Sequence, residues 1–307
     1  MKKQGCRAIL SLLTTGVIPF LASVAVVQAT PEAASQAQAE PRIEEFVYKR
    51  TPQGELKMHV HLPEGWTAQD KRPAIVFFFG GGWRSGSVTQ FLPQAQYLAR
   101  RGMVAARADY RVKSRHGTAP DKCVEDGKSA VRWLRAHAAK LGIDPERIVA
   151  SGGSAGGHVA ACTFTIPGLE TEGEDASISS KPNLLVLFNP VLNCVPIGER
   201  FGMAEMAQRI SPNHHLTKDI PPTIVFFGTK DRLNAGGKEF IEKAAALGLP
   251  AEMFMAPGQP HGFFNRSPWR ERTIDLMDRF LARHGYVEGV PVVEMPADAP
   301  ELEKWEP

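Results

Sequence analysis

Three short, continuously apolar runs, separated by longer stretches of helical pattern, constrain this chain more than any other feature. They are residues 74–80 (AIVFFFG), 184–190 (LLVLFNP) and 223–229 (TIVFFGT). A strand is apolar at every position when both of its faces are buried, as in a parallel sheet covered by helices on both sides. The alternation of strand and helix patterns therefore predicts an α/β protein with a mainly parallel sheet.

Further segments extend this alternation to about eight strands. The additional expected strands are residues 44–50, 56–63, 103–110, 147–151 and 251–257, and the expected helices are 90–101, 121–141, 235–247, 271–284 and one starting near 154. Residues 165–182 and 193–215 fit the alternation poorly. Because both follow predicted strand or helix ends near the candidate site, they are expected to form a small cap region.

The first 29 residues differ from the rest of the chain. Three basic residues precede an apolar run at 8–27, and small residues end the segment at Ala29. This pattern predicts a secretory signal peptide cleaved after Ala29, and hence a secreted or periplasmic protein. A retained membrane anchor is the alternative, since the run is almost long enough to span a bilayer. The proline at position 19 and the small residues at the end favour cleavage.

The remaining chain divides into three segments. Residues 30–42, rich in Ala, Gln and Glu, are expected to form a flexible linker. Residues 43–285 carry the alternating pattern and are expected to form one catalytic domain. Residues 286–307, rich in Pro and Glu, are expected to lie over the surface as a tail. A hydrophobic fraction of 43% with 22% charged residues suits a globular domain with a full core.

Charge and cysteine content exclude several classes of partner. The chain has 36 Lys and Arg against 33 Asp and Glu, and the leader holds three of the basic residues and no acidic one, so 33 of each remain after cleavage. Neither a nucleic-acid partner nor a membrane partner after cleavage is expected. Cys123, Cys162 and Cys194 have no C-x-x-C spacing, which argues against a metal site. One disulfide among them is left open.

The motif G-x-S-x-G at residues 152–156 singles out Ser154. It lies between a predicted strand and a predicted helix, where such a motif forms a sharp turn that exposes the serine hydroxyl. The nearby Ser151 does not have glycines on each of its two sides, as the motif requires, and is expected to be structural. A phosphate-binding loop is the other alternative, but no G-K-[ST] follows.

A serine hydroxyl needs a base and an orienting carboxylate to act as a nucleophile. In sheet enzymes of this kind the acid and then the histidine follow the serine in the chain. Asp231 follows the apolar run at 223–229, and His261 lies in a Gly/Pro loop before the last predicted helix. Asp219 precedes its strand, so it lies at the wrong edge of the sheet. His284 ends a predicted helix, where a histidine is favoured by the helix dipole alone.

A glycine triplet at residues 80–82 ends the first of the three apolar runs. Residues without side chains let backbone N–H groups face a substrate carbonyl oxygen. Together with the N–H of Ala155 they are candidates for an oxyanion hole. Trp83 follows at once and is expected to line the mouth of the substrate pocket. A plain flexible turn is the alternative.

Five motifs in this order resemble the α/β-hydrolase superfamily, and more closely its esterase/lipase branch. They are FGGGW (79–83), DYR (109–111), GGSAGGH (152–158), GTKD (228–231) and PHGF (260–263). The relatives in question are hormone-sensitive lipase and the bacterial feruloyl and acetyl-xylan esterases of the BD-FAE type. The resemblance implies the α/β-hydrolase fold, with Ser154 as nucleophile, Asp231 as acid and His261 as base. It also implies Gly81, Gly82 and Ala155 as oxyanion-hole donors.

One departure narrows the resemblance. Phe79 stands where the lipase-like branch usually has a histidine before the three glycines, so the chain is more similar to the carbohydrate-esterase relatives. The resemblance thus implies a serine esterase for short acyl esters, such as acetylated or feruloylated carbohydrates, with no metal or organic cofactor. A serine peptidase of the prolyl-oligopeptidase type and a non-catalytic binding protein of the same fold are the two alternatives.

Overall fold

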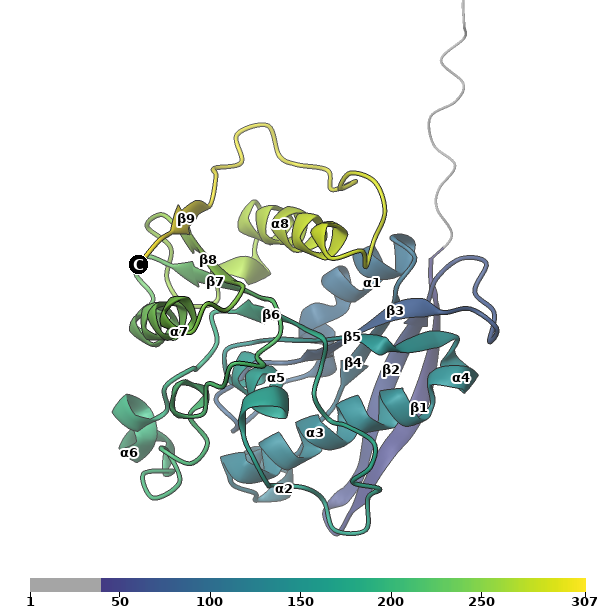
Figure 1. Ribbon diagram of the computed structural model, residues 1–307, viewed down its shortest axis with the longest axis horizontal. Coiled ribbons are helices and arrows are strands. Elements are labelled where there is room, and N and C mark those ends of the chain that lie inside the picture. The colour runs from purple at the N-terminus through teal and green to yellow at the C-terminus, as the bar shows by residue number, and fades with distance from the viewer. Residues whose placement is uncertain (1–39) are drawn as a thin grey trace, which may run out of the picture. The chain divides into compact units, whose positions relative to one another are not determined.

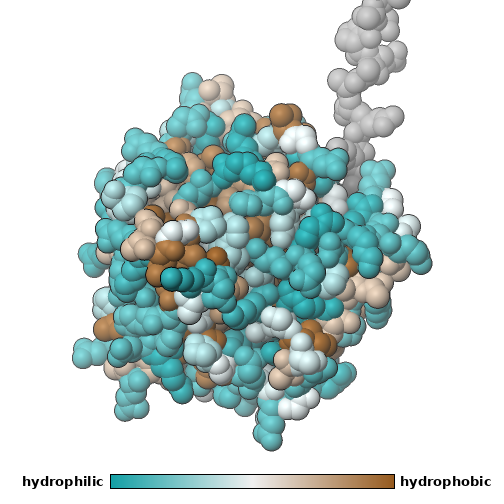
Figure 2. All heavy atoms as spheres, in the orientation of Figure 1, coloured by the Kyte–Doolittle hydropathy of each residue, from teal (hydrophilic) through white to brown (hydrophobic). Residues whose placement is uncertain are grey.

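The computed structural model describes residues 40–307 (Figure 1). The predicted signal peptide, residues 1–29, and most of the predicted linker, residues 30–42, lie outside the described residues. Between residues 40 and 307 no helix combines the length and the apolar character needed to cross a membrane. On the face shown in Figure 2, hydrophilic side chains cover most of the surface and apolar ones form small groups.

A nine-stranded sheet runs through this part of the chain, in the order β1-β2-β4-β3-β5-β6-β7-β8-β9. Its strands are β1 (Arg42–Thr51), β2 (Gly54–Leu62), β3 (Arg72–Phe78), β4 (Val104–Ala108), β5 (Ile143–Gly153), β6 (Leu184–Phe188), β7 (Thr223–Gly228), β8 (Ala251–Ala256) and β9 (Glu303–Trp305). All pairs from β4 to β8 are parallel, whereas β1, β2 and β9 pair antiparallel at the two sides. The mostly parallel sheet expected from the sequence is confirmed.

Helices cover both faces of the sheet. They are α1 (Leu92–Arg100), α2 (Lys113–His116), α3 (Pro120–Ala136), α4 (Ala138–Leu141), α5 (Ala155–Thr165), α6 (Gly198–Phe201), α7 (Asn234–Ala246) and α8 (Trp269–Arg283). Four 3-10 turns join them: η1 (Val88–Phe91), η2 (Val195–Ile197), η3 (Pro212–His214) and η4 (Phe263–Asn265). One apolar cluster joins α3, α5 and α7 to one face, and a second joins α1 and α8 to the other (Figure 1).

The packing of strand β3 explains why its residues 74–78 are all apolar. Val76 and Phe78 belong to the first cluster, and Ile75 and Phe77 belong to the second. All four side chains are at most 1% exposed. Burying each of them stabilises the fold by about 1.5–3 kcal/mol. A polar residue at any of these positions therefore disrupts one of the two layers.

Two predicted segments differ in the structure. The helix expected over 121–141 is divided into α3 and α4 at His137, whose backbone leaves the helical region. Within the segment expected to be a surface tail, Trp305 pairs with Met253 in the antiparallel β8–β9 ladder. The sheet therefore has one strand more than the eight expected. The segment around β9 shows no apolar run, because an edge strand is not buried on both faces.

Of the two segments expected to form a cap, only one lies at the pocket described below. Residues 165–182 are fastened to α3 instead. Lys128 contacts Glu170 at 2.7 Å, and Arg132 contacts Glu174 at 2.6 Å. The cap region beside the pocket comes from residues 193–215, which include η2 and α6.

The three cysteines of the described residues are free and buried. The disulfide left open by the sequence does not form among Cys123, Cys162 and Cys194. Burial raises the pKa of the Cys194 thiol to about 12 and the pKa of the Cys162 thiol well above its usual range. Both therefore stay protonated at neutral pH and pack as small apolar side chains.

Candidate active site

Ser154 stands at a sharp turn between strand β5 and helix α5. Its φ of 53° and ψ of −119° are strained for a residue with a side chain. The turn is held in place because the Ser154 N–H donates to the carbonyl of Phe188 on the neighbouring strand, at 2.9 Å. This is the strand–turn–helix context that the motif predicts.

The glycines around Ser154 are required by close backbone approach. A Cβ on Gly156 would lie 2.1 Å from the carbonyl oxygen of Phe78, and a Cβ on Gly152 would lie 2.5 Å from that of Gly156. Neither distance is compatible with a side chain. Ser151, the competing serine, is fully buried inside β5, so its hydroxyl does not reach the pocket.

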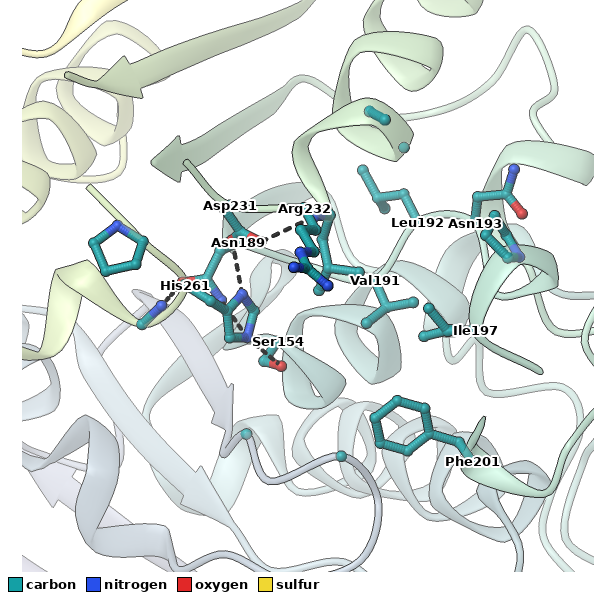
Figure 3. Close-up of a pocket in the computed structure, with 18 of the residues that line it drawn as sticks. Ser154, Asn189, Val191, Leu192, Asn193, Ile197, Phe201, Asp231, Arg232 and His261 are labelled. Carbon is teal, nitrogen blue, oxygen red and sulfur yellow. Dashed lines mark hydrogen bonds and ion pairs between the residues drawn. The ribbon is translucent and has the colours of Figure 1, made fainter. Parts of the chain in front are cut away.

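The structure brings Asp231 and His261 to Ser154 in one chain of contacts (Figure 3). His261 Nε2 lies 2.9 Å from Ser154 Oγ, and His261 Nδ1 lies 2.7 Å from Asp231 Oδ2. Asp231 follows β7 in a loop, and His261 lies in the loop between β8 and η4. Sequence reasoning placed all three residues at the carboxyl ends of parallel strands, and the geometry agrees.

The environments of the two partners differ in a way that suits this chemistry. The Asp231 side chain is 1% exposed, and its other oxygen accepts the N–H of Leu233 at 2.9 Å. A carboxylate accepting at Nδ1 fixes the proton there and leaves Nε2 free to accept from the hydroxyl. The His261 side chain is 41% exposed and faces the pocket. Such an arrangement can move a proton from a serine hydroxyl to an imidazole and back.

The loop after β3 is held by contacts on both sides of its glycines. The Tyr110 hydroxyl donates to the carbonyl of Phe79 at 2.5 Å, and the N–H of Gly80 donates to Gln90 Oε1 at 2.6 Å. The N–H of Gly80 is therefore already occupied. These contacts fix the loop, although Phe79 stands where the lipase-like branch usually has a histidine.

The three predicted oxyanion donors remain available next to Ser154. Gly81 and Gly82 have φ values of 128° and 61°, which favour glycine. Within residues 40–307 their N–H groups have no hydrogen-bond acceptor. Ala155 is the first residue of α5, where a backbone N–H has no partner within the helix. Gly81 and Gly82 thus offer free donors at the pocket, and Ala155 offers one directly after Ser154.

Trp83 lines the pocket as expected, but it is only 2% exposed because its indole is turned inward. Its Nε1–H donates to His158 Nδ1 at 3.2 Å, and its ring packs edge-on against Phe201. His158 in turn contacts the carbonyl of Ile210 at 2.7 Å through Nε2. Trp83 therefore supports the glycine loop from behind.

Asn189 is a residue of the site that sequence reasoning missed. It is fully buried, follows β6 and has a φ of 37°. Its Oδ1 accepts the N–H of Gly262 at 3.0 Å, and its Nδ2 lies 3.5 Å from His261 Nε2. Asn189 thus anchors the loop that carries His261. The sequence held a signal, because Asn189 is a polar residue directly after the apolar residues 184–188, much as Asp231 comes shortly after an apolar strand.

These residues open into a pocket of about 1200 Å³. The cap segment and the loop before it supply an apolar wall, made of Val191, Leu192, Pro196, Ile197 and Phe201. Figure 3 shows this apolar group on the opposite side of Ser154 from His261. Charged side chains also line the pocket: Arg200, Lys230, Arg232 and Glu239. The pocket therefore combines an apolar wall with four charged side chains, one of which, Arg200, comes from the cap segment itself.

Comparisons with known proteins agree on the family. A family model described as BD-FAE matches residues 58–186. The solved structure of esterase 2 from Thermogutta terrifontis, phosphoramylated by tabun, is 45% identical, with a TM-score of 0.78 over 82% of this chain and 98% of that chain. The carboxylesterase NlhH of Mycobacterium tuberculosis is 26% identical over 74% of this chain and 76% of its own length.

A probable isoprenylcysteine alpha-carbonyl methylesterase of Arabidopsis thaliana is 29% identical over 73% of this chain. The chain spans about half (52%) of the length of that plant relative. The expected fold and enzyme class are confirmed by these relatives. The chain belongs to the esterase/lipase family of α/β-hydrolases and is a carboxylic ester hydrolase.

Proposed function

We propose that the protein is a serine esterase that works through an acyl-enzyme. Ser154 attacks the ester carbonyl, and His261 takes its proton and then gives it to the leaving alcohol. Asp231 holds the imidazole in the required tautomer. Water then attacks the acyl-enzyme with His261 as base. The observation that carries this proposal is the continuous chain of contacts from Asp231 to Ser154, at 2.7 and 2.9 Å.

In this proposal Gly81, Gly82 and Ala155 stabilise the oxyanion. Their N–H groups are free, Gly81 and Gly82 line the pocket together with Ser154, and Ala155 directly follows Ser154 in the chain. Loss of one such donor reduces the rate in other enzymes by about a hundred- to a thousandfold. The loop of Gly81 and Gly82 does not need to rearrange during the reaction, because Tyr110 and Gln90 already hold it.

We further propose that the acyl group is short, such as acetyl, and that the alcohol half is carbohydrate-like. Two solved structures of the Thermogutta esterase, each 43% identical to this chain, are of its propionate-bound and butyrate-bound forms. The match to the BD-FAE family model supports a feruloylated or acetylated carbohydrate as the class of substrate.

A series of 4-nitrophenyl esters, together with methyl ferulate, tests the acyl preference and the nucleophile at once. We expect kcat/KM to be highest for acetate to butyrate and to fall for octanoate. All activity should be lost in Ser154→Ala. Equal hydrolysis by wild type and Ser154→Ala would refute the mechanism. Cleavage of an aminoacyl-proline amide but of no ester would instead favour a peptidase.

We also propose that residues 1–29 direct export. The supporting observation is the order of basic residues, apolar run and small-residue end in that segment. The N-terminal sequence of the protein recovered from a bacterial host tests this. The mature chain should begin at Thr30 and lie outside the cytoplasm. An intact N-terminus in the cytoplasmic fraction would contradict the proposal.

A further inference from the structure

The pocket is lined by more unpaired positive than negative side chains, and the ester-hydrolysis mechanism does not use these positive charges. Three cations line the pocket: Arg200 from α6, and Lys230 and Arg232 from the loop between β7 and α7. All three are exposed. Within residues 40–307 none of them forms an ion pair or a side-chain hydrogen bond with the protein. Their charges are therefore available to a ligand.

The two carboxylates of the pocket do not balance these cations. Asp231 is buried and engaged by His261. Glu239 is held by Lys243 at 2.7 Å and by Asn193 at 2.9 Å. Burial opposes ionisation of Glu239, but hydrogen bonding to Lys243, Asn213 and Asn193 lowers the pKa of Glu239 to about 2. Because Lys243 already neutralises Glu239, the open side of the pocket keeps a positive potential.

The position of the cations tells which half of an ester they meet. His261 must give its proton to the leaving alcohol, so the alcohol half lies on the His261 side of Ser154. Lys230 and Arg232 flank Asp231 in sequence, on the same loop that orients His261. Figure 3 shows Arg232 beside Asp231 and above Ser154, between His261 and Val191. Arg232 therefore lies where it can meet the alcohol half, and Lys230 lines the pocket from the same loop.

We propose that the alcohol half of the natural ester carries a negative charge, as the carboxylate of an acidic sugar does. Lys230 and Arg232 attract that charge, and Arg200 adds to the field from the cap. The proposal rests on the esterase function given above and names the class of its substrate. Each exposed cation within about 7 Å of the charge changes kcat/KM by about threefold, and the pair by about tenfold.

Two acetyl esters with the same acyl group test this, one anionic (4-acetoxybenzoate) and one neutral (4-acetoxybenzamide). The measured quantity is the ratio of their kcat/KM values, compared between wild type and variants, so that the difference between the leaving groups cancels. In Lys230→Gln/Arg232→Gln the ratio of anionic to neutral should fall about tenfold. Raising NaCl to 1 M should lower the ratio more in wild type than in the variant, which keeps only Arg200 of the three cations.

Lys218→Gln is the matched control. It removes one positive charge near the amino end of β7, whereas Lys230 follows the carboxyl end of the same strand. It should leave the ratio unchanged. An equal ratio in wild type and the double variant would overturn the inference while hydrolysis of the neutral ester still supported the esterase. Failure of wild type to cleave either ester would instead count against the proposed function.

Discussion

Two walls of the pocket contribute different kinds of groups to the same reaction. One, the backbone wall, consists of residues 79–83 and 152–158. The other, the side-chain wall, consists of residues 228–236 and 257–265. On the backbone wall the free donors are main-chain N–H groups. Glycines there let the strands and helix α5 pack so closely that no Cβ atom would fit between them. On the side-chain wall the reacting groups are an imidazole and a carboxylate carried by loops.

The two histidines of these walls show what the difference means. His158, on the backbone wall, is fully buried, and burial lowers its pKa to about 4. It stays neutral and joins Trp83 to the carbonyl of Ile210. His261, on the side-chain wall, is partly exposed and meets the Ser154 hydroxyl. The same ring is a fixed support in one wall and a proton carrier in the other.

The largest effect should come from removing the proton carrier. His261→Ala leaves Ser154 without a base, so kcat/KM for 4-nitrophenyl acetate should fall by about 10⁴ or more. The fold should persist, because the side chain is partly exposed. Far-UV circular dichroism provides the control. A fall of less than tenfold would remove His261 from the mechanism.

A single added methyl group on the backbone wall should destabilise the fold. Gly156→Ala would place a Cβ 2.1 Å from the carbonyl oxygen of Phe78 and 2.3 Å from that of Phe79. We expect a loss of more than about 3 kcal/mol in the free energy of unfolding in urea. Gly168→Ala is the matched control. With a φ of +68° and no atom within 4 Å of the added Cβ, it should cost only about 1 kcal/mol. Equal losses would contradict the role given to close approach.

Asn189 tests how the side-chain wall is positioned. Asn189→Ala removes the acceptor of the Gly262 N–H and frees the His261 loop. We expect kcat to fall by about ten- to a hundredfold with KM nearly unchanged, because the binding surfaces remain. Asn193→Ala changes another pocket asparagine, which bonds Glu239 and not the triad. Its kcat should stay within about twofold. A rise in KM with unchanged kcat in Asn189→Ala would show a binding role instead.

The smallest effect at neutral pH concerns His158. Its pKa is about 4 in the folded protein against a usual value of 6.5, so the unfolded chain binds the proton first as the pH falls. Stability is therefore unaffected above pH 6.5 and is lost between pH 6.5 and about 4, by roughly 3 kcal/mol. His158→Gln should flatten this part of the curve of unfolding free energy against pH. A variant with the unchanged slope would assign the loss to other groups.

The two walls were not equally predictable from sequence. Ser154, Asp231 and His261 follow from chain order and from the carboxyl ends of parallel strands, since each strand is recognisable as an apolar run. The inward turn of Trp83 was missed because it depends on His158 and Phe201, which lie 75 and 118 residues away. Asn189 was missed for a similar reason, because its partner Gly262 belongs to a distant loop.

The predictions for two segments outside the pocket were wrong for a related reason. Residues 165–182 have a loop composition that suits a cap, but ion pairs of Glu170 and Glu174 bind them to α3. Strand β9 has no apolar run, because pairing at the edge of the sheet needs backbone groups more than buried side chains. Local patterns thus predict the strands and the reacting groups, whereas long-range contacts decide which loops meet the site.

The central claim is that His261 activates Ser154, and labelling with a fluorophosphonate probe tests it most directly. Wild type should incorporate one probe per chain, on the peptide that contains Ser154, as read by mass spectrometry. Ser154→Ala should incorporate none, and His261→Ala should react far more slowly. Folded wild-type protein that takes up no probe, or a label that persists in Ser154→Ala, would contradict the account.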